Sequence, residues 1–193
     1  MSLAWGQSSH DTVPNYTAIT NQERAKWFVV STAGPISLMA SGPLSSAWGT
    51  AFNAPKEYGS HWDGFGKRYG MRLTGISTSN AIEAGFGAVW GEDPRYFRVP
   101  DRSFGSRVKY VITSTFTAPG PDGRWRPAYA RYAAVVGNNF LSNTWRERSE
   151  SGSSDAALRC LTGFAAHMAG SAFTEFWPDV KRKVFRRKQK GHQ

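Results

Sequence analysis

Residues 75–91 read GISTSNAIEAGFGAVWG and carry the most regular helical pattern of the chain. Small residues recur there at four-residue spacing, and one carboxylate shares their face: Gly75, Ser79, Glu83, Gly87 and Gly91. Residues four apart lie on one face of an α-helix, and small side chains let two helices pack with their backbones close together. The stretch therefore predicts a close-packed helix over residues 67–90, followed by a loop.

Three other stretches are also rich in Gly, Ala, Ser and Thr, and they end at Trp48, Trp145 and Trp177. Tryptophan suits a boundary between apolar and aqueous surroundings. We therefore predict a mainly α fold: a compact bundle of four to six short, small-residue-rich helices, either embedded in a membrane, lying at its interface or buried. A β-hairpin around residues 108–131 is the minority alternative, because strand-forming residues flank a strong turn at residues 118–123.

The expected organisation has three parts: a loosely held arm at residues 1–19, one helical domain at residues 20–180 and a basic extension at residues 181–193. The last helix of the domain is expected to end before Pro178, since a residue that precedes proline disfavours the helical conformation. Residues 181–190 hold seven Lys or Arg side chains, in a chain of net charge +10. Such a segment attracts anionic lipid or nucleic acid, and the alternative is a solvated tail.

The beginning of the helical domain carries two local signals. Thr20 and Glu23 have the spacing of a capping box, in which each side chain satisfies a backbone donor at a helix start. Residues 27–55 carry no charge and are interrupted at Gly34-Pro35. Because proline breaks or kinks a helix, we expect two short helices or one kinked helix there.

The sequence offers no signal for a cofactor or a metal. Cys160 is the single cysteine, which excludes an internal disulfide and a cysteine-based zinc site. His61 and Asp63 lie in one loop, without a further ligand at metal-binding spacing. Neither a phosphate-binding loop nor a dinucleotide fingerprint is present. We therefore expect neither a cofactor nor a metal site.

Two charged boxes lie at the ends of the stretches that end at Trp90 and Trp177. Box 1 is Glu92-Asp93-Pro94-Arg95-Tyr96-Phe97-Arg98, and box 2 is Glu175-Phe176-Trp177-Pro178-Asp179-Val180-Lys181-Arg182. Functionally, such a box could place an acid–base pair beside an anion-binding arginine. Structurally, it could end a helix and pin a loop, which is the interpretation we favour, and the two boxes could meet in one charged cluster.

Glu83 is the third point of interest, because a carboxylate on a close-packed face must find a partner or shift its pKa upward. It could titrate or bind a ligand, but we favour a buried pair with Arg or Lys from another helix, or a rotated helix that exposes it. His167 and Ser171 share a face, yet we expect a packed histidine because an orienting acid and an oxyanion hole are not evident. Catalytic roles stay unassigned, with six candidates: Glu83, Glu92, Asp93, Arg95, Glu175 and Asp179.

The two boxes, together with Tyr69-Gly70 and residues 139–143 (Asn-Phe-Leu-Ser-Asn), resemble a family of uncharacterised bacterial proteins. The resemblance spans most of residues 20–188, and the Glu-Asp-Pro-Arg-Tyr-Phe and Glu-Phe-Trp-Pro-Asp boxes are its most specific parts. Members of that family look like exported or envelope-associated proteins. The resemblance implies a location in the bacterial cell envelope, in the periplasm or at a membrane, and it implies no activity.

Three functional hypotheses follow. The first is a membrane-associated envelope protein with a structural or binding role, whose partners are anionic lipid, other envelope proteins or a second copy of itself. The second is an enzyme that acts on a lipid or another anionic envelope substrate, although we lean toward a protein without catalytic activity. The third is a nucleic-acid-binding protein that uses the basic tail. Residues 1–3 do not begin a complete signal peptide, but residues 3–7 have the small residues of a cleavage region.

Overall fold

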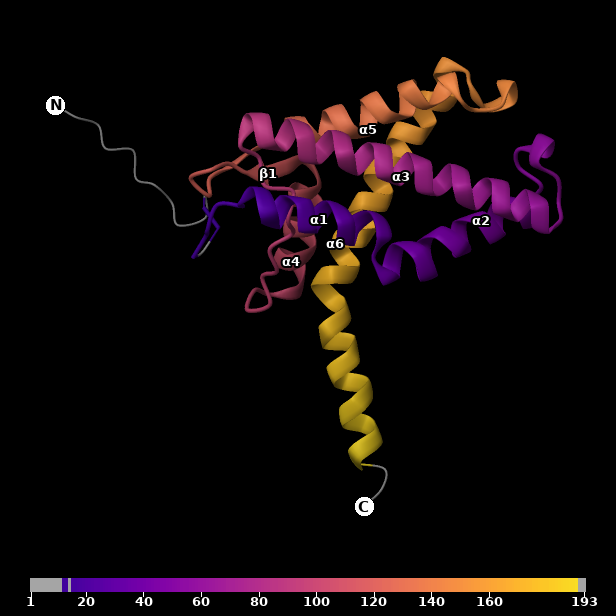
Figure 1. The fold of residues 1–193 in the computed structure, drawn as a ribbon. Coiled ribbons are helices and arrows are strands. Elements are labelled where there is room, and N and C mark those ends of the chain that lie inside the picture. The colour runs from indigo at the N-terminus through magenta and orange to yellow at the C-terminus, as the bar shows by residue number, and fades with distance from the viewer. Residues whose placement is uncertain (1–11, 14, 191–193) are drawn as a thin grey trace.

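Six α-helices and one short hairpin are the main elements of the computed structural model, which describes residues 12–13 and 15–190 (Figure 1). The predicted mainly α fold is confirmed. Two of the helices are much longer than the rest, with 29 residues in α3 and 38 in α6. The helices are α1 (Asn21–Ala33), α2 (Gly42–Ala51), α3 (Trp62–Trp90), α4 (Phe104–Phe116), α5 (Tyr129–Leu141) and α6 (Ser153–Lys190).

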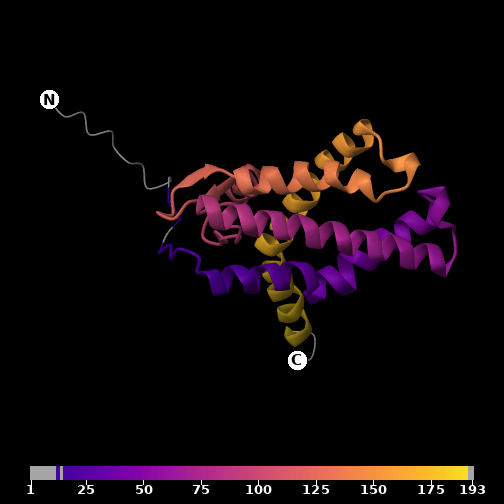
Figure 2. The same cartoon turned by 45° about the horizontal axis from the view of Figure 1, so that its top comes forward.

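Helix α3 lies in the middle of the bundle, between α5 on one side and the α1–α2 pair on the other (Figures 1 and 2). Helix α6 crosses these layers and packs on α4 and α5. The predicted small face of α3 makes room for α1: a Cβ atom at Gly87 would lie 2.6 Å from Nη1 of Arg24 and 3.1 Å from the Glu92 carbonyl oxygen. A side chain at this position would therefore displace the Arg24 guanidinium from the Glu92 carbonyl oxygen.

Both local signals at the beginning of the domain are confirmed. The Glu23 main-chain nitrogen donates to Thr20 Oγ1 at 3.2 Å, and the Thr20 nitrogen donates to Glu23 Oε2 at 2.8 Å. Helix α1 ends at Ala33, with Gly34 as its C-cap in an extended conformation. A π-helical turn at Ile36–Ser41 (η1) then leads directly into α2.

Residues 108–131, for which the sequence left a helix and a β-hairpin as alternatives, contain parts of helices and a short hairpin. Helix α4 is followed by an antiparallel hairpin of β1 (Thr117–Pro119) and β2 (Trp125–Pro127), so the hairpin covers only part of residues 108–131. The hairpin turn contacts the end of α3 at Gly91, which has a φ angle of 73°. A Cβ atom there would lie 2.5 Å from Pro121 Cγ, so both the backbone conformation and the contact require glycine.

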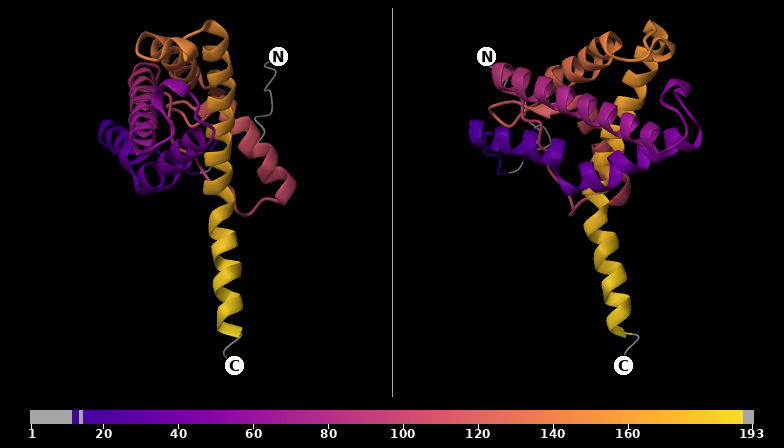
Figure 3. Two further views of the ribbon diagram at one scale, coloured as in Figure 1. Left: turned by 90° about the vertical axis from the view of Figure 1, so that its right-hand side faces the viewer. Right: turned by 45° about the vertical axis from the view of Figure 1, so that its right-hand side comes forward.

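Helix α6 continues through Pro178, so the prediction that the last helix ends before this proline was wrong. Proline removes a main-chain donor and crowds the preceding helical turn. The carbonyl oxygen that loses its donor is that of Thr174, four residues earlier, and the next one, that of Glu175, accepts hydrogen bonds from Arg98 and Arg107 at 2.9 and 2.7 Å. These arginines hold the turn against box 1 and α4. The helix therefore extends through the basic residues, and its C-terminal half projects from the bundle (Figure 3).

The interior of the bundle holds many polar and charged side chains, and many large apolar side chains are exposed. The largest fully buried side chains include Glu175, Asp93 and Thr115, whereas the buried apolar residues are mostly alanine and valine. Large apolar side chains lie on the outside instead; Trp48, for example, is 68% exposed. In the part of the chain that the structure describes, no helix is both long enough and apolar enough to cross a membrane.

Candidate functional site

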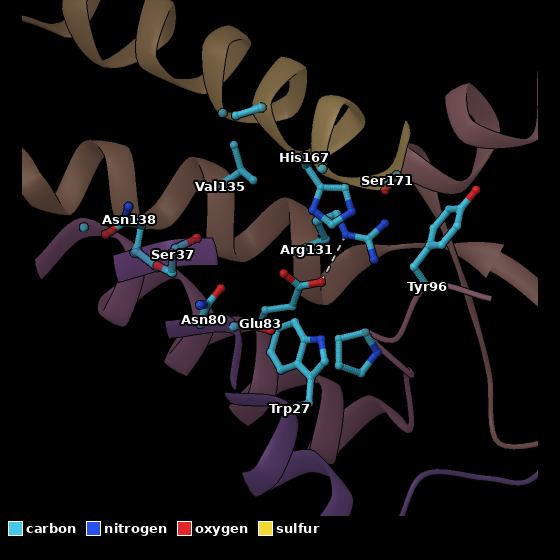
Figure 4. A pocket seen from close by; sticks show the side chains of 18 of the residues that line it. Trp27, Ser37, Asn80, Glu83, Tyr96, Arg131, Val135, Asn138, His167 and Ser171 are labelled. Carbon is cyan, nitrogen blue, oxygen red and sulfur yellow. Dashed lines mark hydrogen bonds and ion pairs between the residues drawn. The ribbon is translucent and has the colours of Figure 1, made fainter. Parts of the chain in front are cut away.

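A cavity of about 850 Å³ is lined by residues of α1, α3, α5 and α6. This volume falls within the range of about 300–1,000 Å³ that is usual for ligand sites. The small residues predicted on α3 contribute to its wall, among them Gly75 and Ser79. Figure 4 shows its polar groups: Asn80 and Glu83 from α3, Arg131 and Asn138 from α5, and His167 and Ser171 from α6.

An ion pair joins α3 to α5 in the cavity wall. Arg131 Nε lies 3.0 Å from Glu83 Oε1, and both side chains are buried (Figure 4). Arg131 Nη1 also donates to the carbonyl oxygen of Ser114, at 2.7 Å, which ties the end of α4 to the same pair. Burial raises the pKa of the Glu83 carboxyl, and the charge of Arg131 opposes this rise. The predicted pairing of Glu83 with a basic residue of another helix is confirmed.

His167 lies beside this ion pair, on α6 (Figure 4). Burial, followed by the positive charge of Arg131, lowers the pKa of the imidazole to about 3, so the ring is neutral at physiological pH. No other described residue forms a hydrogen bond with its ring nitrogens, Ser171 included. A serine nucleophile would need a base within hydrogen-bond reach. The arrangement is that of a packed, neutral histidine in a cavity wall.

In box 1, Glu92 is placed at the beginning of α5. Its Oε2 atom accepts a hydrogen bond from the Ala130 main-chain nitrogen at 2.9 Å. The first main-chain donors of a helix have no partner within the helix, and a carboxylate at this end is favourable. Arg24 on α1 donates to the Glu92 carbonyl oxygen at 2.8 Å. Glu92 thus joins three elements, the end of α3, α1 and α5.

Asp93 and Arg95 pin the loop of box 1 to the chain before α1. The buried Asp93 carboxylate accepts hydrogen bonds from the Arg95 main-chain nitrogen, at 2.9 Å, and from Arg95 Nη2, at 2.7 Å. The Tyr16 hydroxyl donates to the same carboxylate at 3.2 Å. Burial and then the charge of Asp93 raise the pKa of Tyr16 to about 12. These contacts match the structural interpretation of box 1.

The two boxes meet around Glu175. Its Oε1 atom lies 2.6 Å from Arg107 Nε on α4, and its Oε2 atom accepts hydrogen bonds from the Tyr96 hydroxyl at 3.0 Å and from the Val99 nitrogen at 3.2 Å. Asp179 follows one turn later and pairs with Arg107 Nη2 at 2.7 Å. Hydrogen bonds from Arg107 and Arg182 lower the pKa of Asp179. We call these residues the Glu175 cluster: Tyr96, Arg98, Arg107, Glu175 and Asp179.

The six candidate residues do not form one site. Glu83 and Arg95 line the cavity, whereas the other four are not part of its lining: Glu92, Asp93, Glu175 and Asp179. The enzyme hypothesis needs two carboxylates in a pocket with an arginine. Glu175 and Asp179 do converge on Arg107, but they lie outside the lining of this cavity and their oxygens are already hydrogen-bonded. Among the described residues, no group of His, Cys, Asp and Glu side chains is arranged to hold a metal ion.

The sequence analysis did not predict the roles of two important residues, Arg107 and Arg131, as partners of buried carboxylates. A signal for Arg131 exists: it is the only charged residue between positions 129 and 144, and Glu83 is the only carboxylate between positions 64 and 91. Lone opposite charges on two small-residue helices are natural partners, because a buried charge needs one. Arg107 has no such signal, since other basic residues surround it in the sequence.

Comparisons with protein-family models, with curated proteins and with solved structures gave no match to this chain. The resemblance of the two boxes to a bacterial envelope family therefore stays a prediction.

Replacing Glu175 with glutamine should lower the free energy of unfolding by about 3–5 kcal/mol, because the buried Arg107 then loses its nearest carboxylate. Urea unfolding followed by circular dichroism measures this change. Glu147→Gln is the matched control at an exposed loop position, where we expect a change within about 0.5 kcal/mol. Equal unfolding midpoints for the Glu175→Gln protein and the wild type would contradict a stabilising role of the Glu175 cluster.

Replacing His167 with glutamine should remove part of the pH dependence of stability. The pKa of His167 is about 3 in the folded protein and about 6.5 when unfolded, so the unfolded chain binds more protons between these values. Stability is therefore lost as the pH falls through this window. Below about pH 6, the wild type should lose about 1.4 kcal/mol per pH unit more than the variant. Urea unfolding of both proteins between pH 7 and 4 tests this, and parallel curves would refute it.

Proposed function

We propose that the protein is a membrane-associated protein of the bacterial envelope, with a structural or binding role, which lies on an anionic bilayer through α6. One observation carries this proposal. The projecting half of α6 has an exposed apolar stripe, the α6 stripe, whose side chains are 44–51% exposed: Phe173, Trp177, Val180 and Val184. Successive members are three or four residues apart, so they share one side of the helix.

An exposed stripe of this kind calls for a partner. Soluble monomers rarely expose contiguous apolar surface, and larger patches mark contacts with membranes or proteins. Phe173 and Trp177 stack on each other, with ring centroids 5.1 Å apart, so their faces form a continuous apolar surface. Tryptophan is also the residue that suits the boundary between acyl chains and water.

The charge around the stripe favours anionic lipid as this partner. Lys181, Arg182 and Lys183 are exposed on the same part of α6, and four more basic residues follow before position 191. A helix with an apolar side and basic neighbours lies in the plane of a membrane, with its apolar side among the acyl chains and its cations among the phosphates. An anionic bilayer, unlike a neutral protein surface, offers opposite charge along the whole length of this basic segment.

A second exposed stripe is formed by α2 and the residue that follows it: Leu44, Trp48 and Phe52 are 74%, 68% and 66% exposed. These residues are four apart, and they lie in the N-terminal third of the sequence, far from the α6 stripe. Several charged side chains of the bundle are buried instead, among them Glu83, Arg131 and Glu175. We propose an interfacial placement, with the helices lying on the bilayer rather than crossing it.

Vesicle flotation tests the proposal. The purified full chain should float with vesicles of phosphatidylcholine and phosphatidylglycerol, and much less with pure phosphatidylcholine. Replacing Lys181, Arg182 and Lys183 with glutamine should weaken binding by about 100-fold, since each cation contributes about 1 kcal/mol at an anionic surface. The control replaces Lys26, Lys67 and Lys109, which are exposed elsewhere and change the net charge equally.

A second variant separates lipid binding from binding to any polyanion. Replacing Trp177, Val180 and Val184 with glutamine removes the apolar side of the stripe and keeps every charge. This variant should lose vesicle binding and keep whatever affinity the wild type has for duplex DNA. Two results would overturn the proposal and favour the nucleic-acid hypothesis. One is vesicle binding that survives in this variant, and the other is equal loss of binding in the α6 charge variant and its lysine control.

A further inference from the structure

Three arginines line the cavity near the connection between α5 and α6. Arg72 comes from the first half of α3, Arg146 from the connection and Arg159 from the beginning of α6. We call them the arginine end of the cavity. Positions so far apart in the sequence meet here only because α3, α5 and α6 pack around the same space.

The positive charge of the arginine end is only partly balanced. Arg146 pairs with Glu150 at 3.0 Å, and Arg159 donates to the carbonyl oxygens of Glu150, at 2.6 Å, and Asn139, at 3.2 Å. Asp155 also acts on Arg159, while it accepts a hydrogen bond from the Gly152 nitrogen. Arg72 forms no ion pair or hydrogen bond with any described residue.

The arginines also act on one another. Desolvation, and after it the positive charge of Arg146, lowers the pKa of both Arg72 and Arg159. An anion placed between these guanidinium groups would offset both the repulsion and the desolvation. This repulsion is a reason for the site to attract negative charge from outside the protein.

Two buried polar atoms in the same wall lack hydrogen-bond partners among the described residues. Arg159 Nε has no acceptor, and Asn138 Oδ1 has no donor, although the Asn138 residue is only 8% exposed. An unsatisfied buried donor or acceptor costs about 1–3 kcal/mol. The first atom calls for an oxygen acceptor, and the second calls for a hydroxyl or amine donor.

We propose that the arginine end of the cavity binds a phosphate ester head group, and that the rest of the ligand is apolar. Arginine presents several donors in a fixed fork that matches phosphate oxygens, and a head group with a hydroxyl or amine also supplies the donor that Asn138 lacks. Beyond the arginines, the lining includes Met71, Ile76 and Val135, which suit an acyl chain. This site goes beyond the membrane contact proposed for α6 and does not depend on it.

Isothermal titration calorimetry on the full chain tests this site with dihexanoyl phosphatidic acid, kept below its micelle concentration. Replacing Arg72 with glutamine should weaken binding at least about tenfold, since a hydrogen bond to a charged group is lost. Because Arg72 holds no other described residue, the thermal midpoint should stay unchanged. Lys67→Gln, an equal charge change at an exposed position of α3, is the control and should bind like the wild type.

Glycerol 3-phosphate and inorganic phosphate identify the source of the head group. Tighter binding of dihexanoyl phosphatidic acid than of either small anion supports a lipid, and equal binding refutes the apolar part of the proposal. No binding to any probe, or equal affinities for the wild type and Arg72→Gln proteins, would overturn the phosphate site. The variant with glutamine at positions 177, 180 and 184 keeps Phe173, which lines the cavity, and should bind the soluble lipid normally. This result separates the outcome from failure of the membrane contact.

Discussion

Buried arginine side chains hold this bundle together, because its small-residue helices supply little apolar volume for a core. Arg68 donates to the carbonyl oxygens of Ala54 and Gly59, at 2.8 and 2.7 Å, and so fixes the connection between α2 and α3. Arg107 joins α4 to α6 through Glu175, and Arg131 joins α5 to α3 through Glu83. A guanidinium group can do this because its five donors reach several acceptors at once. Each pair is also a vulnerability, since removal of one partner leaves a buried charge.

This polar interior determines what the exterior presents. With charges and small residues inside, the large apolar side chains of α2, α5 and α6 lie on the surface, among them Trp48, Phe140 and Trp177. Apolar surface of this extent is unfavourable in water and favourable against acyl chains. Small residues of α3, such as Gly75 and Ser79, also form part of the cavity wall. The proposed membrane contact and the proposed head-group site therefore have one physical origin.

Local features of the fold could be predicted from the sequence, and features that depend on distant residues could not. The capping box of Thr20 and Glu23 and the break at Gly34 depend on neighbouring residues alone. The small face of α3 predicted a close-packed helix and a paired Glu83, but not which arginine would reach it. Helix α6 passes Pro178 in a turn that arginines from box 1 and α4 hold at the Glu175 carbonyl oxygen, and no local pattern contains these distant contacts. The arginine end of the cavity also depends on residues far apart in the sequence, so no local pattern predicted it.

Tryptophan fluorescence in the presence of vesicles with brominated acyl chains tests most directly whether the apolar exterior faces lipid. Bromine quenches an indole only at close range, and Trp177 is 49% exposed on the α6 stripe. Contact with acyl chains predicts strong quenching of the bound wild-type protein and a smaller quenched fraction after Trp177→Phe. Emission that is unaffected by brominated lipid, in protein that floats with the vesicles, would show that binding is electrostatic only and would contradict the membrane contact of the stripe.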